Sequence, residues 1–411
     1  MSYSYILGAG ASKEYSRSKS GVQPPLAGEF FSTYSQLAIS EDREVRIGDI
    51  VNYVRDTRNV KAEDFCFWNE NIENFLTEIE ESIERRYKSH IHRGLRDLEF
   101  VNLQKVYDRM IFLFSAVLNE IQNGEVCKNY SLLVNRAEFG DTFITLNWDT
   151  LLDRALIDTD NWFIEDGYQI PFKAVYRDKW QKIEPHTEIN KSKYSLLKLH
   201  GSTNWLIPYY SFRLDLGKWD FYNEQANRLR RPIYAFHYAV NRYKTYGNRS
   251  RTGYEPLSYF YYPPDVPLGP KPRRSGYTRI SAVLYPDVNN YGFNPPNGCD
   301  EVSMPLIIPP IKKKKYEFLE GALNDLWAKA RQAMLLSEKI YIIGYSFPET
   351  DIKSWELLES VLLRRRKNLP PLVLVDPHPE ALYNRLVTRL PFIVDLLDVH
   401  KTTFSNFLGK K

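Results

Sequence analysis

Short, largely apolar runs recur along the chain and end at glycine or polar residues. Residues 3–7, 142–146 and 194–199 form three such runs, and residues 339–343 and 372–375 form two more near the C-terminus. Runs of this length without strict polar alternation are typical of strands that are buried on both faces. The pattern therefore predicts that these segments are strands of one covered sheet.

Helical patterns separate the strands in the last quarter of the chain. Apolar side chains recur at helical spacing over residues 318–336, 352–365 and 379–390. Strands and helices in alternation are typical of a parallel sheet whose crossover helices lie on both faces. The predicted fold class is therefore α/β, with a Rossmann-like parallel sheet.

Two longer amphipathic patterns lie between the first and second predicted strands. Residues 71–87 and 103–121 each carry an apolar stripe at helical spacing. Such a stripe is typical of a helix that packs against a core, so we assign these segments no chemistry. We predict that they belong to a helical insertion that covers about residues 32–130.

The stretch after the third predicted strand has a different character. It is crowded with tyrosine, proline and arginine, and it shows no clear hydrophobic periodicity. We interpret residues 207–305 as an inserted lobe with irregular and short-strand structure. The predicted Rossmann-like domain then comprises residues 1–206 and 306–411.

The composition indicates a packed protein with little excess charge. Apolar residues make up 43% of the chain, and 55 Lys and Arg residues oppose 51 Asp and Glu residues, so the net charge is +4. A surplus this small does not favour direct nucleic-acid binding. Basic clusters keep that alternative open, and they comprise Arg228, Arg230 and Arg231 together with residues 271–274, 312–315 and 364–367.

The three cysteines, Cys66, Cys127 and Cys299, are widely separated. Their spacing matches neither a Cys-x-x-Cys zinc pattern nor a disulfide framework, so no metal is expected and a reducing cytoplasm fits. The first residues lack the features of a signal peptide, and no run reaches the ~18 apolar residues of a membrane span. We therefore expect a cytoplasmic protein with no membrane attachment.

The first predicted strand runs into a glycine turn with the sequence GAGAS at residues 8–12. Glycines at such a turn let the backbone approach a pyrophosphate, and a helix that follows offers free N–H groups. Lys13 stands where the Rossmann fingerprint has its third glycine, and the hydroxyl of Ser12 is a candidate phosphate ligand in its stead. The alternative is a turn that only joins a strand to a helix.

Polar residues also follow the next two predicted strands. Asn147 can donate and accept hydrogen bonds, which suits a ribose hydroxyl or a water, although a turn role is the alternative. Asp149 either contacts a ligand or caps the next helix. His200, which Gly201 follows, suits a general base because imidazole titrates near neutrality. Open α/β sheets bind ligands at the carboxyl ends of their strands, so we predict one site there.

The two strands near the C-terminus end at further candidates. Gly344 and Ser346 follow one strand, and Asp376 ends the other. A carboxylate at such a strand end often receives the diol of a ribose. The alternative is that Asp376, with Pro377, simply begins the next helix.

Taken in order, these motifs resemble the sirtuin family, and specifically its bacterial defence-associated branch. Each motif is modestly specific, and the ordered set carries the resemblance over residues 1–206 and 306–397. The matching segments are GAGAS at 8–12, TLNWD at 145–149, KLHGS at 198–202, IIPPIKKKK at 307–315, IIGYSFPETD at 342–351 and LVDP at 374–377.

The resemblance implies a Rossmann-like domain that uses NAD as its substrate. Members of this branch hydrolyse NAD to nicotinamide and ADP-ribose, and they deplete the cell of NAD during phage infection. The resemblance assigns catalysis to Asn147 and His200. It places the following residues around the dinucleotide: Gly8, Ala9, Gly10, Ser12, Thr145, Asp149, Gly344, Ser346 and Asp376.

Two departures separate this chain from the protein-deacylating sirtuins. Those proteins carry a four-cysteine zinc module, which three scattered cysteines cannot form. They also carry Asp-Phe-Arg after the glycine turn, where this chain has PLAGEF at residues 25–30. Hydrolysis of NAD is therefore the leading expectation. The alternatives are NAD-dependent protein deacylation and a non-catalytic NAD or ADP-ribose sensor that regulates a partner ATPase or nuclease.

The resemblance also implies partners. Stand-alone members of this branch work beside a HerA-type hexameric ATPase, so we expect such a partner together with assembly into a homo-oligomer. Aromatic and arginine residues are enriched in protein interfaces, which makes the lobe at residues 207–305 the expected docking surface. An elaborated core is the alternative role of that lobe.

Overall fold

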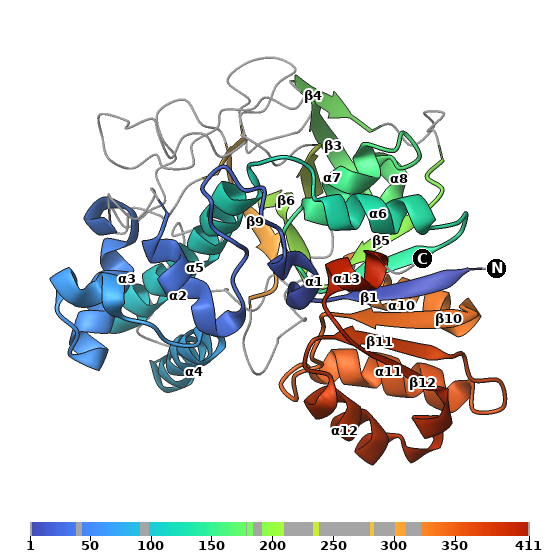
Figure 1. Ribbon diagram of the computed structural model, residues 1–411. Coiled ribbons are helices and arrows are strands. Elements are labelled where there is room, and N and C mark those ends of the chain that lie inside the picture. Colours follow the sequence, from blue (N-terminus) through green and yellow to red (C-terminus); the bar gives the residue numbers. More distant parts are fainter. Residues whose placement is uncertain are drawn as a thin grey trace.

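The computed structural model describes residues 2–37, 43–90, 98–177, 179–183, 191–208, 233–237, 280–282, 301–309 and 322–409. Its first sheet has six strands that all run parallel, in the order β12–β11–β10–β1–β2–β5 (Figure 1). The five predicted strands are all present, and an edge strand is added. The strands are β1 (Tyr3–Leu7), β2 (Thr142–Thr145), β5 (Ser195–Lys198), β10 (Lys339–Ile343), β11 (Leu372–Asp376) and β12 (Leu397–Lys401).

The strand order is that of a Rossmann fold. Numbered along the chain within this sheet, the strands follow the order 3-2-1-4-5-6. The chain passes from β1 to β2 and β5 on one side, and then continues with β10 on the other side of β1. The order therefore reverses between β1 and β10, which is where open α/β sheets bind ligands. The predicted α/β class with a Rossmann-like parallel sheet is confirmed.

Helices cover both faces of the parallel sheet (Figure 1). Successive residues of a strand point to opposite faces of the sheet, so the contacts of Ser4 and Tyr5 identify the helices that cover each face. The hydroxyl of Ser4 lies 2.6 Å from that of Ser337, directly after α10 (Ala322–Leu336). On the other face, the ring of Tyr5 stacks on Tyr341, which contacts Phe407 of α13 (Phe404–Gly409). The other helices of this part are α1 (Ala9–Lys13), α6 (Lys128–Arg136), α7 (Leu151–Ile157), α8 (Ile164–Gly167), α11 (Ile352–Arg364) and α12 (Glu380–Arg389).

A second sheet of six strands lies beside the first, in the order β4–β3–β7–β6–β9–β8. It mixes parallel and antiparallel pairs, and β6 pairs antiparallel with both of its neighbours, β7 and β9. The sequence pattern does not predict this sheet. Its strands are β3 (Phe172–Arg177), β4 (Lys179–Lys182), β6 (Gly201–Pro208), β7 (Ile233–Phe236), β8 (Ile280–Ala282) and β9 (Glu301–Ile307).

The second sheet takes strands from both sides of the boundary expected after residue 206. β3 and β4 precede that boundary, β6 crosses it, and β7 and β8 lie in the segment expected to form a lobe of irregular and short-strand structure. Most of residues 207–305 lie outside the described residues. The strands β7 and β8 have only four and three residues. Hydrophobic periodicity is read over a longer stretch of sequence, so strands this short leave no clear pattern.

A layer of helices connects β1 to β2 and stands to one side of both sheets (Figure 1). The helices predicted over residues 71–87 and 103–121 are confirmed as α4 (Ile72–His90) and α5 (Leu98–Gln122), and α5 packs against β6 and β9. Two more helices, α2 (Phe30–Ser35) and α3 (Arg43–Arg58), lack a clear apolar stripe in the sequence. Among the helices that the structure describes, none is both long and apolar enough to cross a membrane.

Candidate functional site

The carboxyl edge of the parallel sheet brings the second and third predicted motifs together. Thr145 of β2 and Lys198 of β5 lie opposite each other in the parallel register. Asn147 and His200 each follow that pair by two residues, so they lie just past the ends of two neighbouring strands about 4.8 Å apart. Both residues are nearly buried, with 9% of Asn147 and 4% of His200 exposed.

The glycine turn after β1 packs against the turn after β10. The amide of Gly8 donates to the carbonyl of Ile343 (3.1 Å), and the amide of Gly10 donates to the carbonyl of Gly344 (2.9 Å). A Cβ atom on Gly8 would lie 2.5 Å from the Cα of Tyr345, and one on Gly10 would lie 2.8 Å from the Cα of Gly344. Close packing of two backbones therefore requires both glycines.

The turn has fewer free amides than the sequence motif predicts. The amide of Ala11 donates to the carbonyl of Gly8 (3.0 Å), so the amides of Gly8, Gly10 and Ala11 are all engaged within the protein. The helix that follows, α1, has only five residues. The expectation of a helix with several free N–H groups is therefore wrong. Ala9 is the exposed residue at the tip of this turn.

Ser12 lies at the centre of a buried hydrogen-bond network. Its Oγ lies 2.9 Å from the hydroxyl of Tyr130, donates to Oδ2 of Asp149 (2.9 Å) and accepts a hydrogen from Nδ2 of Asn147 (3.1 Å). Ser12 is fully buried, so its hydroxyl is directed at protein partners and not at a phosphate. Its observed role is to join the glycine turn to the loop after β2.

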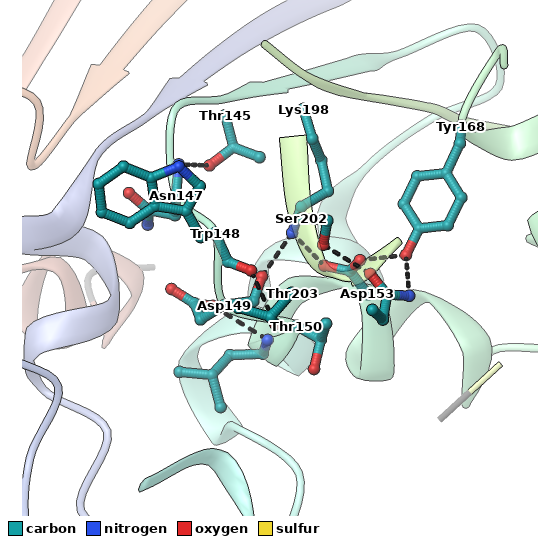
Figure 2. A network of polar contacts seen from close by, with 12 residues as sticks. Thr145, Asn147, Trp148, Asp149, Thr150, Asp153, Tyr168, Lys198, Ser202 and Thr203 are labelled. Carbon is teal, nitrogen blue, oxygen red and sulfur yellow. Dashed lines mark hydrogen bonds and ion pairs between the residues drawn. The ribbon is translucent and has the colours of Figure 1, made fainter. Parts of the chain in front are cut away.

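The side chain of Asn147 is held in one orientation. Its Nδ2 donates one hydrogen to the carbonyl of Gly8 (2.9 Å) and the other to Ser12. Its backbone amide donates to the hydroxyl of Thr145 (3.1 Å), which donates in turn to the carbonyl of Leu7 (3.1 Å). Figure 2 shows Thr145 and Asn147 at this loop. Both hydrogens of Nδ2 are used within the protein, so a ligand can interact with this side chain only through its carbonyl oxygen, Oδ1.

The carboxylate of Asp149 accepts hydrogen bonds from the start of the next helix and from the glycine turn. Its Oδ1 accepts the amide of Leu151 (3.0 Å), the first residue of α7, while its Oδ2 accepts the hydroxyl of Ser12. Burial raises the pKa of the Asp149 carboxyl above its ordinary value, and the nearby charge of Lys198 offsets part of that rise. The N-cap position of α7 is Thr150, and the Asp149 carboxylate, one residue earlier, lies within the protein interior.

A buried charge network lies behind the two strand ends (Figure 2). The ammonium group of Lys198 donates to the carbonyl of Asp149 and forms an ion pair with Asp153 (3.1 Å). Tyr168 donates its hydroxyl hydrogen to Asp153 and accepts one from Asn204 (3.0 Å). Burial and the charge of Asp153 raise the pKa of the Tyr168 hydroxyl well above its usual range. The network ties the parallel sheet to the second sheet.

His200 lies where the chain leaves the parallel sheet and enters the second one. The next residue, Gly201, has a φ of +79°, and a Cβ atom there would lie 2.0 Å from the carbonyl oxygen of Leu306. The carbonyl of His200 accepts the amide of Ile308 (2.8 Å). Only glycine fits after the histidine, because this turn is left-handed and presses against β9.

The imidazole of His200 faces a carboxylate that the sequence motifs do not single out. Its Nε2 lies 3.4 Å from Oδ2 of Asp351, and both side chains are buried. The hydroxyl of Tyr345 donates to the same carboxylate oxygen (2.6 Å). The signal available in the sequence was an acidic residue at the end of the GYSFPETD segment, but nothing there relates it to His200.

The remaining predicted residues lie at the ends of β10 and β11. Gly344 has a left-handed backbone with a φ of +58°. Ser346 is exposed, and its carbonyl accepts a hydrogen bond from Arg385 (2.5 Å). Asp376 is half-buried, and its Oδ1 accepts the amide of His378 (2.7 Å). This hydrogen bond is typical of a residue that begins a turn, here the turn that leads into α12. All three lie at the same sheet edge as Asn147 and His200.

One of the four basic clusters lies within the described residues, at the end of α11. Arg365 donates to the carbonyl of Met334 (3.3 Å), and the guanidinium of Arg366 lies 5.2 Å from the centre of the Phe392 ring. Two of its cations therefore have contacts within the protein. The clusters outside the described residues are those at 228–231, 271–274 and 312–315.

Two of the three cysteines are visible in the structure, and both are free thiols. Cys66 is partly buried and Cys127 is buried, whereas Cys299 lies outside the described residues. Within the part of the chain that is described, no three His, Cys, Asp or Glu side chains are grouped as metal ligands would be. The Pro-Pro segment at 307–315 is described only as far as Pro309.

The strand order and the polar residues at the carboxyl edge of the sheet define a Rossmann-type α/β protein. No protein-family profile and no curated protein sequence matches the chain. A solved structure described as "The Structural basis of Sirtuin Substrate Affinity" is similar over 100% of this chain and 92% of its own, with 12% identity and a TM-score of 0.34. Fold class rests on the strand order, because a likeness at this level is too weak to support it.

Proposed function

We propose that this protein is a sirtuin-like NAD glycohydrolase that releases nicotinamide and ADP-ribose. The observation that carries the proposal is that Asn147 and His200 both lie just past the ends of neighbouring strands, two residues beyond the paired Thr145 and Lys198. This placement lies at the sheet edge where Rossmann folds bind nucleotides. The ordered motifs that resemble sirtuins support the same function.

The proposed reaction breaks the bond between the ribose and the nicotinamide ring. Positive charge develops on the ribose carbon, as in other glycosidic cleavages, and nicotinamide leaves as a neutral base. In the proposal, Oδ1 of Asn147 accepts a hydrogen bond from a ribose hydroxyl or from the attacking water. His200 takes a proton from the water or the ribose hydroxyl as a general base.

The predicted cofactor-binding residues divide into two groups. Ala9 and Ser346 are exposed and Asp376 is half-buried, so we propose that these three contact the dinucleotide directly. Asp376 ends β11, where a carboxylate suits a ribose diol. The second group, which we propose to shape the loops around the nucleotide, comprises the buried Gly8, Ser12, Thr145 and Asp149 and the half-buried glycines Gly10 and Gly344.

The test is nicotinamide release from NAD by the purified full chain, measured by chromatography. The reaction is run with the protein alone, and with a HerA-type ATPase and DNA. We expect His200→Ala and Asn147→Ala each to lower the rate by ~10²–10⁴-fold, because each removes one positioned group. Asp398→Asn is the control, because Asp398 is exposed on the edge strand β12.

Each alternative function predicts a different outcome. Full release by both variants contradicts the assignment of Asn147 and His200. Removal of the acetyl group from an acetyl-lysine peptide, with NAD consumed, indicates a protein deacylase. Saturable binding of NAD or ADP-ribose without turnover, with the ATPase present, indicates a sensor.

We further propose that the enzyme acts in the bacterial cytoplasm as an antiphage effector that depletes NAD. The support is the resemblance of the ordered motifs to the defence-associated branch. A hydrolase active at all times would poison its host, so we propose control by homo-oligomer formation and by a HerA-type ATPase. Cells that carry His200→Ala are expected to lose protection in a phage challenge, and size-exclusion chromatography of the mixed proteins tests the assembly.

A further inference from the structure

We propose that Asp351 is a positioning residue that holds the imidazole of His200 in the tautomer required of a base. The inference rests on the proposed function, because it takes His200 as the base in NAD hydrolysis. It adds a carboxylate that acts through His200 and does not itself touch the substrate.

The contact between the two side chains is buried. Nε2 of His200 lies 3.4 Å from Oδ2 of Asp351, with side-chain exposures of 5% and 1%. A carboxylate removed from water is costly unless donors or cations surround it. Tyr345 supplies a donor at 2.6 Å, and its hydroxyl also lies 3.0 Å from that of Ser354. The carboxylate is therefore fixed in place on one side and faces the imidazole on the other.

Asp351 reaches His200 from a distant strand. The segment that carries Asp351 follows β10, whereas His200 follows β5, and β1 and β2 lie between those strands. Three strand spacings correspond to about 14 Å across the sheet edge. The segment after β10 and the residues after β5 together span this distance to bring the two side chains within 3.4 Å of each other.

The backbone of that segment is bent at two positions. Gly344 has a φ of +58° and Phe347 has a φ of +47°. A left-handed backbone at a bulky residue carries strain and persists only where the surroundings hold it. The Phe347 ring is buried between Tyr345 and Trp355, with ring centres 4.5 Å and 5.2 Å away. Aromatic packing therefore maintains the bend that presents Asp351.

The residues next to Asp351 anchor it from two further directions. The hydroxyl of Thr350 donates to Oε1 of Glu73 on α4 (2.6 Å), which connects the segment to the helical layer. The carbonyl of Asp351 accepts the amide of Ser354 in the first turn of α11 (3.1 Å). With both flanks held, the carboxylate is oriented by the backbone and does not depend on the histidine for its position.

The contact with Asp351 determines which ring nitrogen of His200 can act as the base. A neutral imidazole that directs Nε2–H at a carboxylate keeps its lone pair on Nδ1. In the proposed step, Nδ1 takes a proton from water or a ribose hydroxyl, Nε2 keeps its hydrogen, and Asp351 remains ionised. The imidazolium that forms then lies beside a negative charge, which stabilises it.

The substitution Asp351→Asn separates this role from a purely structural one. Asparagine has nearly the same shape, its carbonyl oxygen can still accept the Tyr345 hydroxyl, and the backbone cap of α11 is unchanged. Only the charge is removed. The matched control is Asp398→Asn, which removes the charge of a second His–Asp pair, Asp398 and His400 at 3.1 Å, on an exposed edge strand.

The experiment measures kcat and KM for NAD with the full chain under the conditions in which the wild type releases nicotinamide. We expect Asp351→Asn to lower kcat by roughly 10²-fold, within the range that a positioned base contributes, with a much smaller change in KM. Asp398→Asn should match the wild type. An active wild type with an unchanged Asp351→Asn variant overturns the inference alone, whereas an inactive wild type overturns the proposed function and with it this role.

A second measurement does not depend on how the variant folds. Histidine-selective ¹⁵N NMR of the wild type reports which ring nitrogen carries the hydrogen, and the His200 signals are assigned by their loss in His200→Gln. We expect the Nε2–H tautomer when the ring is neutral. An Nδ1–H tautomer for His200 overturns the inference, whatever the kinetics of Asp351→Asn.

Discussion

The ammonium group of Lys198 lies 3.1 Å from Oδ2 of Asp153, and both side chains are buried. Lys198 ends β5 two residues before His200, and Asp153 lies on α7, whose first amide donates to Asp149. The pair therefore connects the elements on which both proposed catalytic residues depend. A buried ion pair of this kind contributes little net stability when intact, but the loss of one partner leaves the other charge unpaired.

We expect Lys198→Met to lower the free energy of unfolding by about 3–5 kcal/mol, because the buried Asp153 would lose its cation. Urea denaturation at neutral pH measures the change. Lys401→Met is the control, since Lys401 pairs with Glu380 on the surface and its removal should leave the urea midpoint unchanged. Equal effects of the two substitutions would contradict the role assigned to the buried pair.

Gly201→Ala should disturb the site through the backbone. The added Cβ would lie 2.0 Å from the carbonyl oxygen of Leu306, and the φ of +79° is strained for alanine by about 1–2 kcal/mol before any clash is counted. We expect lower stability by thermal unfolding and loss of nicotinamide release, since His200 is displaced. Gly48→Ala is the control, because Gly48 has open space around it in α3 and alanine should stabilise that helix slightly.

Asp149→Asn should change how stability depends on pH. Burial raises the pKa of Asp149 in the folded protein above its ordinary value of 3.8. The folded state therefore holds this proton more tightly than the unfolded state, and the associated stability is present below that value and lost as the pH rises through the folded pKa.

Urea denaturation of both proteins between acidic and neutral pH tests this direction. The wild type should lose stability relative to Asp149→Asn as the pH rises from about 4. A difference that stays constant across the range, or that changes in favour of the wild type, would contradict the raised pKa.

Ser12→Ala distinguishes a structural hydroxyl from a phosphate ligand. The substitution removes a partner of Tyr130, Asp149 and Asn147 in a fully buried network, so we expect a loss of about 1–3 kcal/mol in unfolding free energy without NAD present. Ser20→Ala, at an exposed serine in the loop that follows, is the control and should be neutral. If stability is unchanged and only the KM for NAD rises, Ser12 binds phosphate after all.

Much of the parallel sheet was predictable from the sequence, because its inner strands are buried on both faces. The strands predicted over residues 3–7 and 339–343 coincide with β1 and β10. The edge strand β12 was not predicted, since one side of it faces solvent and its residues Leu397–Lys401 include charged side chains. The second sheet was not predicted either, because it is assembled from short strands that lie far apart in the sequence.

The sequence by itself determined the α/β class, the strand ends and the identity of the polar residues placed on them, because burial and turn formation leave local patterns. Only the tertiary structure decided which of those residues face inward, such as Ser12 and Asp149, and which distant group faces His200. Asp351 could not be related to His200 from sequence, because their proximity depends on strand order and on a bend at Phe347. Contacts between elements depend on register and packing, and neither leaves a signal in a single local segment.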